Sequence, residues 1–301
     1  MPNYVTNIIT MKADEKQLQE IYQTIKADDG ELGSFDFNKL VPMPESLNMT
    51  MGSITDKAIN AYLSYLRNEL ELHPDRPGLP EQVKRYILAG IQAKGALFGT
   101  PEFLTPAGID AEAKSNDMST ADFLEMGKQY LDNQINYGAL TWYQFCSDRW
   151  GTKWNAPEGI LMDEEDSRIM NFDTAWSAPL PIIEAMSKRF PDVEITIQWA
   201  DEDIGTNVGR QTYRDGQVID EFIPESWSKE AYDLAFETFG DTPADRCMRY
   251  DEKEGTYVYD EELEQEQLKV LEERLQEAQA RRLEQSAGAE GQEQPEKDTE
   301  R

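Results

Sequence analysis

Two carboxylates in the second half of the chain, Asp201 and Asp203, follow directly after a segment in which apolar and polar residues alternate. Carboxylates at the end of a strand often hold Mg²⁺, because this hard cation takes oxygen ligands. Asp201 and Asp203 are therefore a candidate metal site, in which Lys153 or Arg210 would supply the positive charge that a phosphate-bearing substrate needs. The alternative is structural: in a loop, the same carboxylates cap turns and hold Gly205 in place.

The aromatic stretch 137–156 contributes to a second candidate site. Aromatic walls with a few polar groups are the usual form of a small-ligand pocket. Gly151 permits a turn, and we expect Lys153 to lie between two indole rings in a cation–π arrangement. The candidate pocket comprises Trp142, Trp150, Lys153, Trp154, Asn155, Asp173 and Trp176. In the structural alternative, which we prefer, these residues close a helix onto a sheet, and Lys153 pairs with Asp173 or Asp201.

Several motifs that would indicate a particular chemistry are missing from the sequence. It contains no GxxxxGK(S/T) phosphate loop, no GxGxxG after a strand, no HExxH and no paired CxxC. The single histidine, His73, lies in a predicted loop, and a Ser-His-Asp or Cys-His mechanism would have to use it. Cys146 lies among aromatic residues and is expected to be a buried thiol. We predict no catalytic residue and no cofactor, and we prefer a non-enzymatic role while leaving the question open.

The chain is strongly acidic, with 29 Lys and Arg against 59 Asp and Glu and a net charge of −30. Residues 251–301 hold 17 acidic and 7 basic residues, or −10, so the rest of the chain carries −20. This charge argues against direct nucleic-acid binding, since phosphate contacts are made by Lys and Arg, and against docking on anionic membranes. Two interpretations remain: a surface that favours solubility, or one that meets basic partners or imitates nucleic acid.

The cysteine content and the hydropathy suggest a cytoplasmic protein. Two cysteines, Cys146 and Cys247, are too few for a disulfide framework and suit a reducing compartment. The N-terminus does not resemble a signal peptide, and no apolar run of about 18 residues is present to span a bilayer.

The N-terminal residues 1–50 predict a β–α–β opening of a sheet domain. Tyr4–Met11 alternates β-favouring residues on two faces, which is typical of an interior strand. Asp14 is placed to cap a following amphipathic helix. Phe35–Val41 is then expected to form a second strand, closed by prolines.

Residues 51–136 predict a helical insertion. Apolar stripes at helical spacing indicate three helices, one carrying Ile59 and Leu66, one starting at Pro80 and one capped by Ser119. Residues 95–117 are rich in Gly, Pro and Ala and are expected to form a loop.

Residues 137–242 predict an α+β domain with helices on one face of an antiparallel sheet. Alternation indicates strands, helical spacing indicates helices, and Asp215-Gly216 between two alternating runs indicates a hairpin. The expected elements are a strand at 168–176, a helix after Pro179 and Pro181, strands at 193–199, 208–213 and 217–223, and a helix capped by Ser228.

The C-terminal part differs in kind from the rest of the chain. We expect residues 243–285 to form an acidic linker and a solvated or partner-dependent helix. In this helix Leu268, Leu271, Leu275 and Ala278 follow 3–4–3 spacing, but two heptads are too few to hold a coiled coil alone. The composition of residues 286–301 predicts disorder.

Four segments together resemble one known family: the opening MPNYVTNIITMKA, TWYQFCSDRWGTKWNA (141–156), FDTAWSAPLP (172–181) and IQWADEDIGTNVG (197–209). They look like the Api92-like, or YubB-type, proteins of phages and plasmids. The likeness covers residues 1–44 and about 137–240. It implies a ferredoxin-like C-terminal part and a mobile-element setting in a bacterial host, and it leaves the biochemical role open.

Two hypotheses on function follow. The first is an accessory interaction protein of a phage or plasmid, whose acidic surface acts on a host protein with a basic surface, such as a nucleic-acid-handling or defence protein. The second is a small-ligand-binding or metal-dependent enzyme that uses Asp201, Asp203, Lys153 and Asn155. The first is preferred because the charge imbalance is large and no catalytic motif is specific. The oligomeric state is left open.

Overall fold

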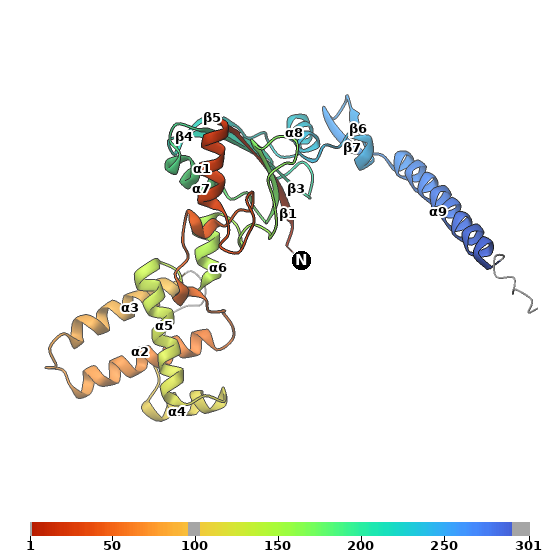
Figure 1. Cartoon of the computed structure of the whole chain (residues 1–301). Coiled ribbons are helices and arrows are strands. Elements are labelled where there is room, and N and C mark those ends of the chain that lie inside the picture. Colours follow the sequence, from red (N-terminus) through yellow and green to blue (C-terminus); the bar gives the residue numbers. More distant parts are fainter. Residues whose placement is uncertain (1, 96–102, 291–301) are drawn as a thin grey trace, which may run out of the picture.

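The protein consists of an antiparallel sheet with its helices, a helical block, and a long C-terminal helix that extends away from both (Figure 1). The computed structural model describes residues 2–95 and 103–290. None of the helices in these ranges combines the length and apolarity needed to cross a membrane.

The main sheet has five strands in the order β2-β1-β3-β4-β5, and every neighbouring pair is antiparallel. The strands are β1 (Tyr4–Lys12), β2 (Ile169–Ala175), β3 (Glu194–Asp201), β4 (Gly209–Arg214) and β5 (Gln217–Phe222). Because β1 runs antiparallel to both β2 and β3, these two are parallel to each other, and α7 (Leu180–Arg189) connects them. This is the split βαβ arrangement of ferredoxin-like folds. The predicted α+β fold with an antiparallel sheet is confirmed.

The N-terminal strand β1 lies inside this sheet, between β2 and β3. Val5, Ile9 and Met11 of β1 are four and two residues apart and therefore lie on the same face of the strand. All three are fully buried, as expected for an interior strand. The next helix, α1 (Glu15–Ile25), starts with a capping box in which the Asp14 side chain accepts from the Gln17 N–H. α1 and α7 pack on the same face of the sheet, over one continuous core.

The last helix of the domain, α8 (Lys229–Phe239), covers the opposite face. It packs on Ala200 through Leu234 and Ala235, and Gln198 Nε2 donates to Thr238 Oγ1 at 3.1 Å. Successive residues of a strand point to opposite faces, so the helices lie on both faces of the sheet. This differs from the sequence prediction, which placed all of them on one face.

The strand predicted at Phe35–Val41 is wrong. This segment forms a short 3-10 helix, Phe37–Lys39, whose first turn is capped by the Asp36 carboxylate. The alternation of apolar residues arises because Phe35 and Phe37 both pack into the core, where their rings contact each other edge to face. Periodicity over so few residues does not distinguish a strand from a packed turn.

In its described residues the helical block contains four helices: α2 (Thr55–Leu72), α3 (Leu79–Gly95), α4 (Pro106–Ser115) and α5 (Thr120–Tyr137). Three match the prediction, whereas α4 falls inside the predicted loop at 95–117. Its start is well specified, since Thr105 caps the helix by accepting from the Gly108 N–H and Pro106 follows at the first turn. Residues 96–102 of the predicted loop lie outside the described ranges.

The aromatic stretch joins the helical block to the sheet domain. It folds into a short helix, α6 (Trp142–Phe145), and then into one turn of π-helix, Cys146–Trp150. Gly151 ends this turn with a left-handed backbone, φ 77°.

The predicted linker after residue 243 contains a hairpin, β6 (Met248–Asp251) and β7 (Thr256–Tyr259), which we did not predict. The Asp251 carboxylate caps the turn between its strands by accepting from the Lys253 N–H. The final helix is α9 (Glu261–Glu290), and its residues 264–279 are all exposed, as expected for a solvated helix. Residues 286–290 are helical, contrary to the predicted disorder, and residues 291–301 lie outside the described ranges.

Candidate functional site

Trp176, directly after β2, is an exposed aromatic residue on a strained backbone. Its φ is 72°, which is rare for a bulky side chain, and 41% of its surface is exposed. Hydrogen bonds hold the peptide on both sides: the Trp176 N–H donates to Asn3 O at 2.9 Å, and Asn207 Nδ2 donates to Trp176 O at 3.0 Å. Strain of this kind persists where the surroundings fix it, and it concentrates at functional sites.

Lys153 lies between Trp176 and Trp154. Its Nζ atom is 4.6 Å from the Trp176 ring centroid and 4.7 Å from that of Trp154. The predicted cation–π arrangement is therefore confirmed. The predicted pairing with Asp173 or Asp201 is wrong, since no carboxylate of the described residues forms an ion pair with Lys153.

Two side-chain hydrogen bonds tie the lysine segment to the end of β2. Thr152 Oγ1 donates to Ala175 O at 2.8 Å, and Ser177 Oγ donates to Gly151 O at 2.5 Å. Gly151 is required for two reasons: its φ is positive, and a Cβ there would lie 2.6 Å from Pro181 Cδ. The turn therefore brings Lys153 over the indole of Trp176.

A third aromatic residue, Tyr143, completes this surface. Its ring lies 5.9 Å from that of Trp176 and 5.9 Å from that of Trp142, edge to face in both cases. The side chain is 38% exposed. We call the group Tyr143, Lys153, Trp154 and Trp176 the Trp176 surface. Sequence reasoning missed Tyr143 because nothing in its local pattern distinguishes it from the core aromatics beside it.

Three residues of the predicted pocket have structural roles instead. Trp150 is buried, and its Nε1 donates to Val41 O at 2.9 Å. Asn155 Nδ2 donates to Asp36 Oδ1 at 2.7 Å, while its oxygen accepts from the Phe37 N–H at 2.8 Å. Asp173 accepts from Thr6 Oγ1 at 2.8 Å on the sheet. The predicted seven residues therefore do not converge on one pocket.

Asp201 uses its carboxylate to organise the loop between β3 and β4. Its side chain is buried, with 6% of the residue exposed. The Oδ1 atom accepts from the Asp203 N–H at 2.9 Å and from Asn3 Nδ2 at 3.3 Å. The Oδ2 atom accepts from Asn207 Nδ2 at 2.9 Å. Within residues 2–95 and 103–290, no cluster of three or more potential ligands suits a metal ion. These contacts favour the structural interpretation of Asp201 over the metal site.

Through Asn207, the same loop fixes Trp176. One amide group donates both to Asp201 and to Trp176 O, so the loop conformation and the aromatic surface depend on each other. Asn207 itself has φ 44°, a region that Asn tolerates better than most residues. No sequence signal singled out this residue, because its role depends on which strand ends lie together.

A second exposed tryptophan, Trp227, borders the loop. It also has a left-handed backbone, φ 66°, and is 50% exposed. Its N–H donates to Gly205 O at 2.8 Å. A Cβ at Gly205 would lie 2.7 Å from the Tyr232 ring, so this glycine is needed for the close packing. Two strained, exposed tryptophans thus contact one loop.

Two further candidates from the sequence, Cys146 and His73, do not form a site. Cys146 is buried, and burial raises its pKa to about 12, which makes it a poor nucleophile. His73 is exposed and follows the end of α2.

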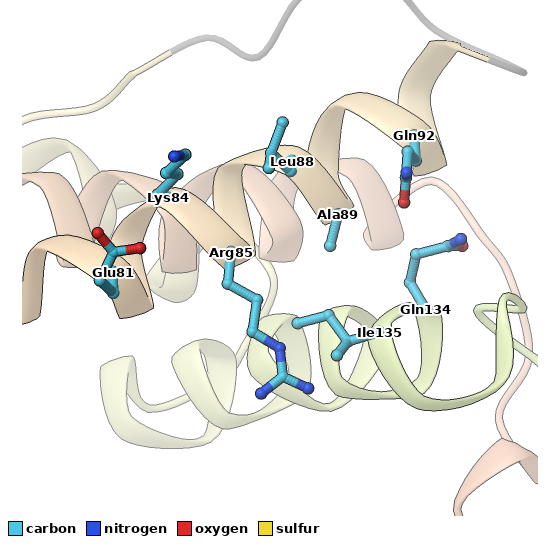
Figure 2. Close-up of a pocket in the computed structure, with 8 residues that line it drawn as sticks. All are labelled: Glu81, Lys84, Arg85, Leu88, Ala89, Gln92, Gln134 and Ile135. Atoms are coloured by element: carbon cyan, nitrogen blue, oxygen red, sulfur yellow. The ribbon is translucent and has the colours of Figure 1, made fainter. Parts of the chain in front are cut away.

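A hollow of about 360 Å³ lies away from the Trp176 surface, in the helical block between α3 and α5 (Figure 2). Its lining includes Lys84, Arg85, Leu88 and Ala89 from α3, and Gln134 and Ile135 from α5. Sequence reasoning did not identify it.

Comparison with known proteins supports the resemblance for one part of the chain. Residues 149–241 match the family model described as the ferredoxin-like domain in Api92-like protein. A search of curated proteins gives no match. A solved structure, described as the crystal structure of a protein api92 from Yersinia pseudotuberculosis, is similar with 12% identity and a TM-score of 0.35, over 75% of this chain and 99% of that chain. Residues 149–241, from the π-helical turn through α8, are therefore similar to the ferredoxin-like domain of Api92-like proteins.

Proposed function

We propose that this chain is an accessory interaction protein of a phage or plasmid, which acts in the bacterial cytoplasm on a host protein with a basic surface. The observation that carries the proposal is Trp176, an exposed indole held on a strained backbone by Asn3 and Asn207. A rigid aromatic residue loses little conformational entropy on binding, and tryptophans are enriched among the residues that dominate interface energies.

The charge of the chain indicates the chemistry of the partner. With a net charge of −30, the protein attracts basic surfaces and repels acidic ones. Glu202 and Asp203 are exposed in the loop whose Asn207 holds Trp176, so negative charge lies close to the aromatic anchor. In the proposed interaction, the acidic surface attracts the basic host protein, and Trp176 and Trp227 stabilise the complex once it has formed.

Capture from host lysate on immobilised protein, followed by titration of each identified partner, tests this function. We expect a partner with a basic surface, whose dissociation constant rises with salt because added ions screen the charges. Trp176→Ala should weaken binding by about 30-fold, as for a residue that dominates an interface. Circular dichroism establishes that the variant is folded.

Tyr65→Ala is the matched control, because Tyr65 lies in the helical block and is 39% exposed, close to the 41% of Trp176. It should bind the partner as the wild type does. Equal binding by wild type and Trp176→Ala, or binding that salt does not change, would rule out this function.

A further inference from the structure

Helix α9 presents an apolar stripe that nothing covers within one copy. Every residue from 264 to 279 is exposed. Leu268, Leu271 and Leu275 follow one another at spacings of three and four residues and are 51–53% exposed. Such a stripe is what a helix needs in order to dock in a groove of a partner.

The hollow between α3 and α5 has the complementary form. Ala89 and Ile135 contribute apolar surface, and Leu88 is 52% exposed at its border (Figure 2). Ile91, 50% exposed, extends the apolar surface along α3. Exposed apolar surface of this kind, bordered by polar groups, commonly marks an interaction site.

Charge favours α9 as the occupant of this hollow. Helix α9 contains nine acidic and four basic residues, whereas α3 contains one acidic residue and three basic ones, in a chain with a net charge of −30. The charged residues that line the hollow are Glu81, Lys84 and Arg85, so its lining is net positive. Lys84 and Arg85 are exposed and form no ion pair with any residue in the described part of the chain. Pairing α9 with a second α9 would instead bring two acidic helices together over only two heptads.

The two surfaces cannot meet within one molecule, because Figure 1 shows α9 and α3 at opposite ends of the protein. We propose that α9 of one copy docks in the groove between α3 and α5 of a second copy, with its leucine stripe on Leu88, Ala89 and Ile135 and its carboxylates beside Lys84 and Arg85. The contact joins two different surfaces, so each copy carries one donor helix and one acceptor groove. It does not depend on the function proposed above.

Sedimentation velocity of the full chain, at concentrations up to the millimolar range, provides the test. The helix variant carries Leu271→Asp and Leu275→Asp, and the groove variant carries Arg85→Glu and Leu88→Asp. All four side chains are exposed, so the fold should survive. The wild type should self-associate more weakly as salt is added, and each variant alone should associate at least about tenfold more weakly.

A mixture of the two variants is the decisive sample. The groove of the helix variant and the helix of the groove variant are both intact, so the mixture should form a one-to-one complex. Val218→Asp, an exposed change on β5, should leave wild-type association unchanged. A monomeric wild type, a mixture that stays monomeric, or a groove variant that still self-associates through α9 would each overturn the proposal.

Discussion

Lys153 Nζ lies 4.6 Å from the centre of the Trp176 indole and 4.7 Å from that of Trp154. Within the described part of the chain the lysine has no carboxylate partner, although the sequence holds two acidic residues for every basic one. The rings therefore take the place of a counter-ion: they attract the ammonium group through their quadrupoles and shield its stem from water.

Replacing Lys153 with Met should destabilise the fold modestly. The stem still packs between the indoles, but the cation–π attraction, worth about 0.5–2 kcal/mol, is lost. Lys153→Arg keeps the positive charge and should therefore lose less stability than Lys153→Met. The free energy of unfolding in urea measures both variants, and equal stability of Lys153→Met and wild type would show that the contact contributes nothing.

At Trp176, glycine should be tolerated better than alanine. Both substitutions remove the indole, but at φ 72° a Cβ is strained by about 1–2 kcal/mol, and glycine removes that strain. Part of this stabilisation is offset because glycine has more conformational freedom in the unfolded chain and loses more entropy on folding. We expect Trp176→Gly to be about 0.5–1 kcal/mol more stable than Trp176→Ala in urea denaturation, and the opposite order would argue against a strained backbone here.

The strands of the main sheet and the cap residues could be predicted because each rests on a local pattern. Alternation identified β1 and β3, and Asp215-Gly216 identified the hairpin between β4 and β5. Helix α4 was missed because its few apolar residues, among them Ile109, leave the helical pattern weak.

The site was only partly predictable, for a different reason. The neighbouring indole of Trp154 could be anticipated from its position beside Lys153. The second ring, Trp176, is 23 residues further along and reaches Lys153 through a left-handed turn that Asn207 holds. Such a contact depends on the tertiary arrangement of three segments, and no periodicity in the sequence reports it.

The contact between α2 and α5 depends on Gly127. A Cβ there would lie 2.0 Å from Ala58 O and 2.6 Å from Ala58 C. Since both atoms belong to the backbone of α2, no side chain can rotate away. Gly127→Ala should therefore destabilise the helical block by about 3 kcal/mol or more, at or above the upper end for overpacked sites.

Thermal unfolding followed by circular dichroism measures this loss. Gly52→Ala is the control, because nothing lies within 4 Å of a Cβ at that position. It should change stability by no more than about 0.5 kcal/mol. If both variants melt alike, the two helices are not packed as closely as described here.

The two thiols should differ sharply in reactivity. Burial raises the pKa of Cys146 to about 12, so at pH 8 only about one molecule in ten thousand carries the thiolate. Cys247 is partly exposed, and its Sγ lies 3.4 Å from Gln267 Oε1. Labelling with a disulfide reagent at pH 8 should modify one thiol in the native protein and two after denaturation. Cys247→Ser should abolish the fast reaction, and rapid native labelling of Cys146 would contradict its burial.

Alkaline pH should destabilise the sheet domain through Tyr213. Burial, together with the nearby charges of Glu184 and Glu221, raises the pKa of Tyr213 from 10.0 to about 12. The unfolded state then loses its proton at a lower pH than the folded state. The contribution of Tyr213 is therefore fully present below pH 10 and is lost as the pH rises to about 12, at about 1.4 kcal/mol per pH unit.

Tyr213→Phe separates this effect from that of other buried tyrosines, such as Tyr22, whose pKa is also raised by burial. At pH 7 the variant should be less stable, because Tyr213 donates to Gln211 Oε1 at 2.6 Å. Between pH 10 and 12, however, its free energy of unfolding should fall less steeply with pH than that of the wild type. The difference between the two slopes should correspond to the one proton of Tyr213. Urea denaturation across this range gives both slopes, and identical slopes would mean that Tyr213 ionises in the folded protein as readily as in the unfolded chain.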